Sequence, residues 1–85
     1  MKDLRKAGAF AAMAEAPQDG SLLIGRDAAG DEFLMRWRTE ATILKEDGPD
    51  DQRPPYWARW HSDRRVAPVE WAPTLLTPED VMHWA

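Results

Sequence analysis

Two short stretches of the chain contain the residue types that could do chemistry. The first, R-P-P-Y-W-A-R-W-H, runs from Arg53 to His61 and places a tyrosine, two tryptophans and a histidine among arginines. The second, E-D-G-P-D-D, runs from Glu46 to Asp51 and contains four acids. Aromatic rings beside arginines are typical of protein interfaces and of single-stranded nucleic-acid sites. Clustered acids can imitate phosphates on a basic surface, or can simply keep a loop hydrated.

The histidines do not belong to a recognisable catalytic or metal-binding pattern. His61 and Asp63 stand two residues apart, His83 is distant from both, and no serine is placed to complete a nucleophilic relay. The chain has no cysteine, which excludes a disulfide and a thiolate metal site. We therefore expect a protein that is not an enzyme and that holds no metal ion and no cofactor.

Charge and composition indicate which partners the protein would meet. The 85 residues allow one domain, 1–85, and the formal net charge of −4 disfavours direct nucleic-acid binding, which normally needs a basic excess. The alanine-rich run over 7–16, with only Phe10 and Met13 as large apolar residues, is too weakly apolar for a secretory signal. We expect no membrane partner and a location in the cytoplasm of a bacterial host, because many alanines and arginines are typical of GC-rich bacteria and their phages.

Two helices are predicted near the ends of the chain. Asp3 can cap an amphipathic helix over 3–15, and Pro17 would help to end it. A short helix over 78–84 follows Thr77, which is a candidate N-cap. The apolar faces would consist of Leu4, Ala7, Phe10, Ala11 and Ala14 in the first helix and of Val81 and Trp84 in the second.

Four strands are predicted between these helices, because the apolar residues there recur with a period of two. They cover about 21–26, 32–38, 56–62 and 66–72. Thr39 to Lys45 could extend the second strand or make one helical turn, and we favour the strand. Residues 46–55, with three prolines and four acids, are expected to form an exposed acidic loop. The predicted fold class is α+β: a four-stranded antiparallel meander with the N-terminal amphipathic helix packed on one face and a short C-terminal helix.

The alternation along the strands predicts a core face and an outer face of the sheet. The core face would hold Phe33, Met35, Trp37, Tyr56, Trp60, Val69 and Trp71. The outer face would hold Arg36, Arg38, Trp57, Arg59, His61 and Glu70. In a structural interpretation, arginines cover the Trp57 ring and Glu70 pairs with a neighbouring arginine. In the alternative interpretation, a partner binds this face or the loop acids, which are Glu46, Asp47, Asp50 and Asp51.

One segment near the C-terminus resembles a known group of proteins. P-V-E-W-A-P-T, Pro68 to Thr74, is similar to the terminal signature of a family of small phage proteins of unknown function that end in a T-H-W-M-P-L-like motif. Trp71 and Pro73 are the matching residues. D-G-S-L-L-I, Asp19 to Ile24, resembles an upstream segment of the same family. The resemblance implies an origin in a mobile element and implies no particular activity.

A small acidic protein of phage character without a catalytic pattern resembles anti-CRISPR proteins, which act by occupying a surface of another protein. We therefore predict an inhibitor that binds a host protein complex, such as a CRISPR effector, and blocks its access to target DNA. One alternative is a single-stranded nucleic-acid-binding domain that uses Trp57 for stacking and Arg36, Arg38 and Arg59 for phosphate contacts. Another is a phage structural or accessory protein. A homodimer formed through the outer face or an edge strand is also predicted.

Overall fold

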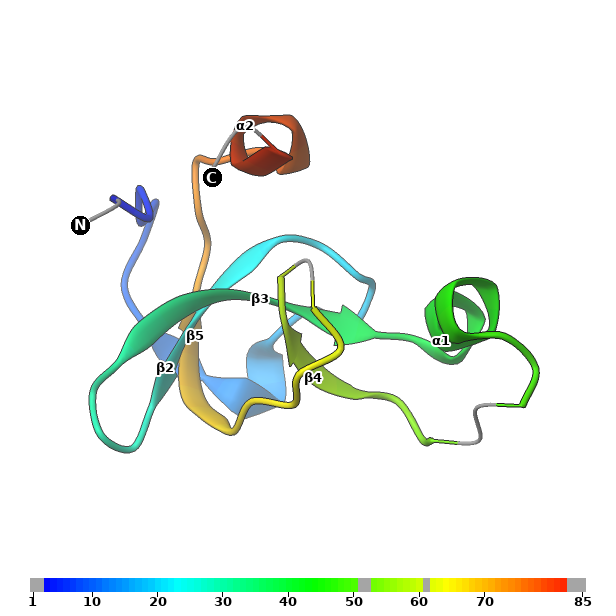
Figure 1. Cartoon of the computed structure of the whole chain (residues 1–85). Helices are drawn as coiled ribbons and strands as arrows, with labels where there is room; N and C mark the ends of the chain where they lie inside the picture. The colour runs from blue at the N-terminus through cyan, green and yellow to red at the C-terminus, as the bar shows by residue number, and fades with distance from the viewer. Residues whose placement is uncertain (1–2, 51–52, 61, 83–85) are drawn as a thin grey trace.

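A five-stranded antiparallel sheet lies at the centre of the protein in a computed structural model that describes residues 3–50, 53–60 and 62–82 (Figure 1). The strands follow the order β1-β5-β2-β3-β4 across the sheet. They are β1 (Ala11–Ala12), β2 (Leu23–Asp27), β3 (Glu32–Arg38), β4 (Tyr56–Arg59) and β5 (Pro68–Ala72). The helical elements of these residues are the 3-10 helix η1 (Met13–Glu15) and the α-helices α1 (Glu40–Asp47) and α2 (Pro78–Met82).

The strand order corrects the predicted four-stranded meander. Strands β2, β3 and β4 are consecutive neighbours as predicted, but β5 lies between β1 and β2 instead of beside β4. Ile24 of β2 pairs with Ala72 of β5. The physical reason is the apolar run at the start of β2, where Leu22, Leu23 and Ile24 are all buried. A strand that is buried on both faces is suited to the middle of a sheet, with a neighbour on each side.

The prediction of an N-terminal helix over 3–15 is wrong, because this segment runs alongside β5 as an extended chain. The N–H of Ala7 donates to the carbonyl of Pro73 at 2.8 Å, and β1 continues the pairing further along. Gly8 disfavours a helix at this point by about 1 kcal/mol relative to alanine. The open edge of β5 offers backbone partners and so overrides the weak helical pattern, while η1 is a single short turn.

The segment after β3 is helical, so the preference for a strand over 39–45 is wrong. The hydroxyl of Thr39 caps α1 by accepting a hydrogen bond from the N–H of Thr42 at 3.1 Å. Gly48 ends the helix with a φ of 88°, a conformation that glycine adopts without strain. The first two positions of the predicted loop over 46–55 therefore belong to α1.

Strands β4 and β5 are both shorter than predicted, because the chain between them turns back beside β4. The N–H of Val66 donates to the carbonyl of Trp57 at 3.0 Å, and Arg65 forms an antiparallel bridge with Ala58. This return covers backbone groups on the outer edge of β4. The predicted strands over 56–62 and 66–72 are thereby reduced to Tyr56–Arg59 and Pro68–Ala72.

Helix α2 begins with a reciprocal cap. The hydroxyl of Thr77 accepts from the N–H of Asp80 at 3.2 Å, and the carboxylate of Asp80 accepts from the N–H of Thr77 at 2.9 Å. Thr77 is thus confirmed as the residue that caps this helix. Val81 is buried as predicted, whereas Trp84 and the predicted end of the helix lie outside the described residues.

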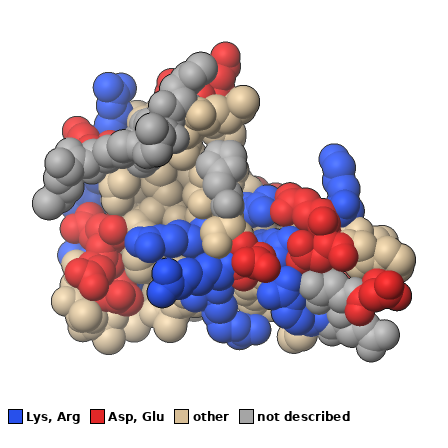
Figure 2. All heavy atoms as spheres, in the orientation of Figure 1, with Lys and Arg blue, Asp and Glu red and all other residues tan. Residues whose placement is uncertain are grey.

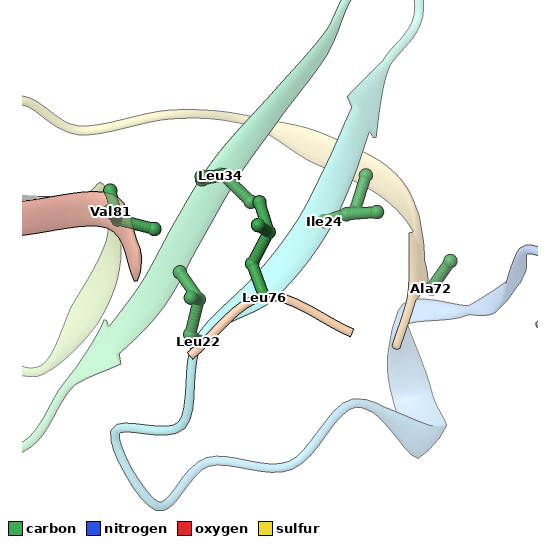
Figure 3. Close-up of a cluster of buried hydrophobic side chains, with 6 residues drawn as sticks. All are labelled: Leu22, Ile24, Leu34, Ala72, Leu76 and Val81. Atoms are coloured by element: carbon green, nitrogen blue, oxygen red, sulfur yellow. The ribbon is translucent and has the colours of Figure 1, made fainter. Parts of the chain in front are cut away.

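The sheet buries apolar side chains on both faces, so the prediction of one core face and one hydrated face is wrong. Consecutive apolar residues on β2 and β3 point alternately to the two sides. One cluster consists of Leu22, Ile24, Leu34, Ala72, Leu76 and Val81, with Leu4, Phe10 and Trp60 packed against it (Figure 3). The opposite cluster consists of Leu23, Phe33 and Met35, with Met13, Trp57, Val66 and Trp71 packed against it.

Candidate functional site

The register between β3 and β4 decides which side chains share a face. Trp37 pairs directly with Trp57, and Arg38 pairs directly with Tyr56. Directly paired residues project to the same side of a sheet. Trp57 therefore lies with Trp37 and the cluster around Phe33, while Tyr56 lies with the arginines of β3. The predicted core face, which joined Tyr56 and Trp60 to Trp37, is wrong, and so is the predicted outer face, which joined Trp57 to Arg36 and Arg38.

Three tryptophans lie on one side of the sheet, and we call Trp37, Trp57 and Trp71 the tryptophan face. Each of the three is partly buried, and none is fully covered by the described residues. The rings of Trp37 and Trp57 meet edge to face, with their centroids 5.1 Å apart. Trp71 pairs across the sheet with Gly25, where Met35 and Phe33 fill the space that a side chain would occupy. The tryptophan face is therefore an aromatic surface held by antiparallel strands.

The arginines of β3 lie on the opposite side and pair with acids of α1. Arg36 makes a two-pronged contact with Glu46, at 2.7 and 3.1 Å. Arg38 is 1% exposed and lies 2.9 Å from the carboxylate of Asp47, which also pairs with Arg53 at 2.8 Å. Glu46 and Asp47 were predicted as exposed loop acids. Their charges are instead engaged by arginines of the same chain.

Tyr56 completes the environment of the buried guanidinium of Arg38. The Nη1 group of Arg38 donates to the hydroxyl of Tyr56 at 2.6 Å, and this hydroxyl donates to the carbonyl of Asp63 at 2.7 Å. Burial acts to lower the pKa of Arg38, but the hydrogen bonds with Tyr56 and Asp47 raise that pKa overall. Hydrogen bonding to Arg36 lowers the pKa of Glu46, although burial opposes this.

This set of ion pairs borders a shallow pocket of about 550 Å³. The pocket is lined by Arg36, Arg38, Glu46, Asp47, Trp60, Ser62 and Asp63. Arg36 and Arg38 pair with Glu46 and Asp47, and each of these four side chains has a partner of opposite charge within 3.3 Å. The arrangement stabilises the attachment of α1 to the sheet, and among the acids of the pocket Asp63 remains largely exposed, with Arg53 at 4.0 Å.

The remaining predicted site residues are scattered. Glu70 pairs at 2.8 Å with Arg26, an arginine of β2. The interpretation that Glu70 pairs with a neighbouring arginine is therefore confirmed. Arg59 is exposed on β4, with its guanidinium 5.7 Å from the centre of the Phe33 ring. Asp50 is exposed after α1. His61 and Asp51 lie outside the described residues.

Two exposed arginines were missing from the sequence-based site. Arg64 and Arg65 lie in the turn after β4, and together with Arg59 they form what we call the arginine patch. The patch lines an open pocket of about 350 Å³, which also involves Asp27, Asp31, Phe33, Val66 and Ala67. Two adjacent arginines close to a third in the sequence are the signal that could have indicated a basic patch.

Comparison of the chain with protein-family models, with curated proteins and with solved structures finds no match. Within residues 3–50, 53–60 and 62–82, no helix is long and apolar enough to cross a membrane. The same residues include no group of three or more histidines, cysteines and acids arranged to hold a metal ion. The candidate site is thus defined by two surfaces, the tryptophan face and the arginine patch.

Proposed function

We propose that the protein is a non-enzymatic inhibitor that binds a host defence complex through the tryptophan face, in the manner of an anti-CRISPR protein. The observation that supports this most is the presence of three partly exposed tryptophans on one side of the sheet. Tryptophan dominates the energetics of protein interfaces because it buries a large area at a low cost in side-chain entropy. A prearranged aromatic surface also loses little further freedom on binding.

The resemblance of P-V-E-W-A-P-T to small phage proteins supports a target in the bacterial cytoplasm, where phage and host proteins meet. Obstruction of the complex by the bound protein would then block access to target DNA. We do not assign this role to acids that imitate phosphates, because Glu46 and Asp47 pair with Arg36 and Arg38. The same pairs weaken the nucleic-acid alternative, which needs Arg36 and Arg38 for phosphate contacts.

A plaque assay tests the proposal. The protein is expressed in a panel of bacterial strains, each with one active CRISPR system that targets a matched phage. We expect plaque formation to return to the level of a strain without the targeting spacer in at least one member of the panel. Trp57→Phe and Trp71→Ala should reduce this effect in variants that are folded by circular dichroism. Leu44→Ala is the matched control, because Leu44 is 57% exposed on α1, outside the tryptophan face.

Two results would contradict the proposal. One is a complete lack of protection across the panel by soluble, folded protein. The other is protection that the tryptophan variants leave unchanged, which would place the contact elsewhere. The oligomeric state should be measured on the same samples by light scattering, because a homodimer formed through the tryptophan face would compete with the target for the same surface.

A further inference from the structure

Four of the eight arginines pair with acids of the described residues, and three of the others lie at or just after the end of β4. Arg26, Arg36, Arg38 and Arg53 each have a carboxylate within 2.9 Å. Within the part of the chain that the structure describes, Arg59, Arg64 and Arg65 make no ion pair, although all three are exposed. No carboxylate of the described residues neutralises these three charges within the fold. Their arrangement therefore favours a role in binding.

Backbone contacts hold the arginine patch in place. The N–H of Arg59 donates to the carbonyl of Arg64 at 3.0 Å, and the N–H of Ser62 donates to the carbonyl of Arg59 at 3.1 Å. The hydroxyl of Ser62 accepts from the N–H of Arg64 at 2.9 Å. The bridge between Arg65 and Ala58 then fixes the next residue against β4. The patch is thus built on a closed turn and a strand edge.

Aromatic rings support two of the three guanidinium groups. Arg59 lies 5.7 Å from the centre of the Phe33 ring, on the side of the tryptophan face, and Arg65 lies 5.0 Å from the centre of the Tyr56 ring, on the opposite side, so the patch extends around the edge of β4. A guanidinium over a ring keeps its edge free to donate two parallel hydrogen bonds to a carboxylate. Phe33 and Val66 belong to the cluster beneath the tryptophan face and also line the pocket of the patch, so the two surfaces adjoin.

We propose that the arginine patch binds an acidic peptide segment of the protein partner at the edge of β4, next to the tryptophan face. This inference rests on the proposed function, since it names the chemistry of the partner at the same surface. A short acidic peptide suits the patch better than a nucleic-acid strand, because the net charge of −4 and the two acids of the same pocket, Asp27 and Asp31, oppose a long polyanion. Figure 2 likewise shows basic side chains over the middle of this view with acidic side chains on either side.

Fluorescence anisotropy with short labelled peptides tests the inference on the purified full chain. We expect saturable binding of an oligoglutamate peptide that weakens as salt is added, and no binding of an oligoglutamine peptide of equal length. Arg59→Gln, Arg64→Gln and Arg65→Gln should each weaken binding by about two- to fivefold, the range for an exposed ion pair. Arg26→Gln changes the net charge equally and should leave binding unchanged, because Arg26 pairs with Glu70.

Three results would overturn the inference. The first is no binding of oligoglutamate, and the second is a loss of peptide affinity in Arg26→Gln equal to that in the patch variants. The third is binding of a single-stranded oligonucleotide that is tighter than peptide binding and depends on the same arginines. The last result would identify a nucleic-acid site. The peptide experiment needs no host component, so its outcome is independent of the plaque assay. Peptide binding without protection in any strain would refute the proposed function alone, whereas protection that needs Trp57 without peptide binding would refute the arginine patch alone.

Discussion

The indole rings of Trp37 and Trp57 stand at 67° to each other with their centroids 5.1 Å apart, across a directly paired position of β3 and β4. Such an edge-to-face pair contributes about 0.5 to 1.5 kcal/mol beyond the apolar area that it buries. It joins the short strand β4 to the centre of the sheet. Trp57 therefore supports the fold as well as forming part of the tryptophan face.

Trp57→Ala is expected to lower the free energy of unfolding by about 2 to 4 kcal/mol, somewhat less than the 3 to 5 kcal/mol that is typical of a fully buried aromatic residue. Trp60→Ala, on the opposite side of the sheet, should have an effect of similar size. Urea titrations followed by far-ultraviolet circular dichroism measure both. The exciton signal of the Trp37–Trp57 ring pair should vanish in Trp57→Ala and persist in Trp60→Ala. A free energy of unfolding for Trp57→Ala close to that of the wild type would contradict the described packing.

Tyr56→Phe should lower the free energy of unfolding by about 1 to 3 kcal/mol, because it removes the hydroxyl that accepts from Arg38 and leaves a buried charged donor without that acceptor. The aromatic ring stays, so the loss reports on the hydroxyl alone. Denaturant titrations provide the measurement. Unchanged stability would mean that Asp47 satisfies the guanidinium by itself.

Glu46 should make the stability depend on pH in the acidic range. Arg36 lowers the pKa of Glu46 in the folded protein. The contribution of Glu46 to the free energy of unfolding is therefore present above the unfolded-state pKa and is lost as the pH falls through the lower folded-state pKa. The side chain is 43% exposed, and we expect only about 0.5 to 1 kcal/mol at neutral pH. Glu46→Gln should therefore be less stable than the wild type at neutral pH and should match it in strong acid. A constant difference at every pH would argue against this ion pair.

Gly25→Ala tests the packing under the tryptophan face. An added Cβ would lie 2.5 Å from the sulfur of Met35 and 2.7 Å from a ring carbon of Phe33. Overpacking of this kind costs about 1 to 3 kcal/mol. The variant Gly25→Ala/Met35→Ala should lose less stability than the two single variants together, because the shortened side chain makes room. Strict additivity in thermal or urea unfolding would show that Met35 is not the obstacle.

Local signals in the sequence predicted the parts of the fold that depend on neighbouring residues. The hairpin between β2 and β3, with Gly30 at a φ of 89°, and the cap of Thr77 on α2 are of this kind. The position of β5 between β1 and β2 depends on pairings between residues that are far apart in the chain. Periodicity along one strand carries no information about which distant strand will lie beside it.

The prediction of the candidate site was wrong for a related reason. The alternation within β4 was correct, but the register with β3 placed Trp57 beside Trp37 and Tyr56 beside Arg38. The burial of Arg38 also depends on α1, because only a helix after β3 brings Glu46 and Asp47 over the arginines. Because residues 39–45 were predicted to form a strand, Arg38 was predicted to lie on a hydrated face, although it is buried and paired with Asp47.

The position of β5 also has a consequence for the time course of synthesis on the ribosome. Strands β2, β3 and β4 leave the exit tunnel in the order in which they pair, and they can assemble at once. The N-terminal segment has no such early neighbour, since β1 contacts the sheet through β5, which is made after the other four strands. Until Ala72 has been synthesised, the edge of β2 that pairs with β5 lacks its neighbour, and an unpaired strand edge of this kind is prone to aggregate. The sheet therefore reaches its full width only after β5 has been made, because β5 joins β1 to the other three strands.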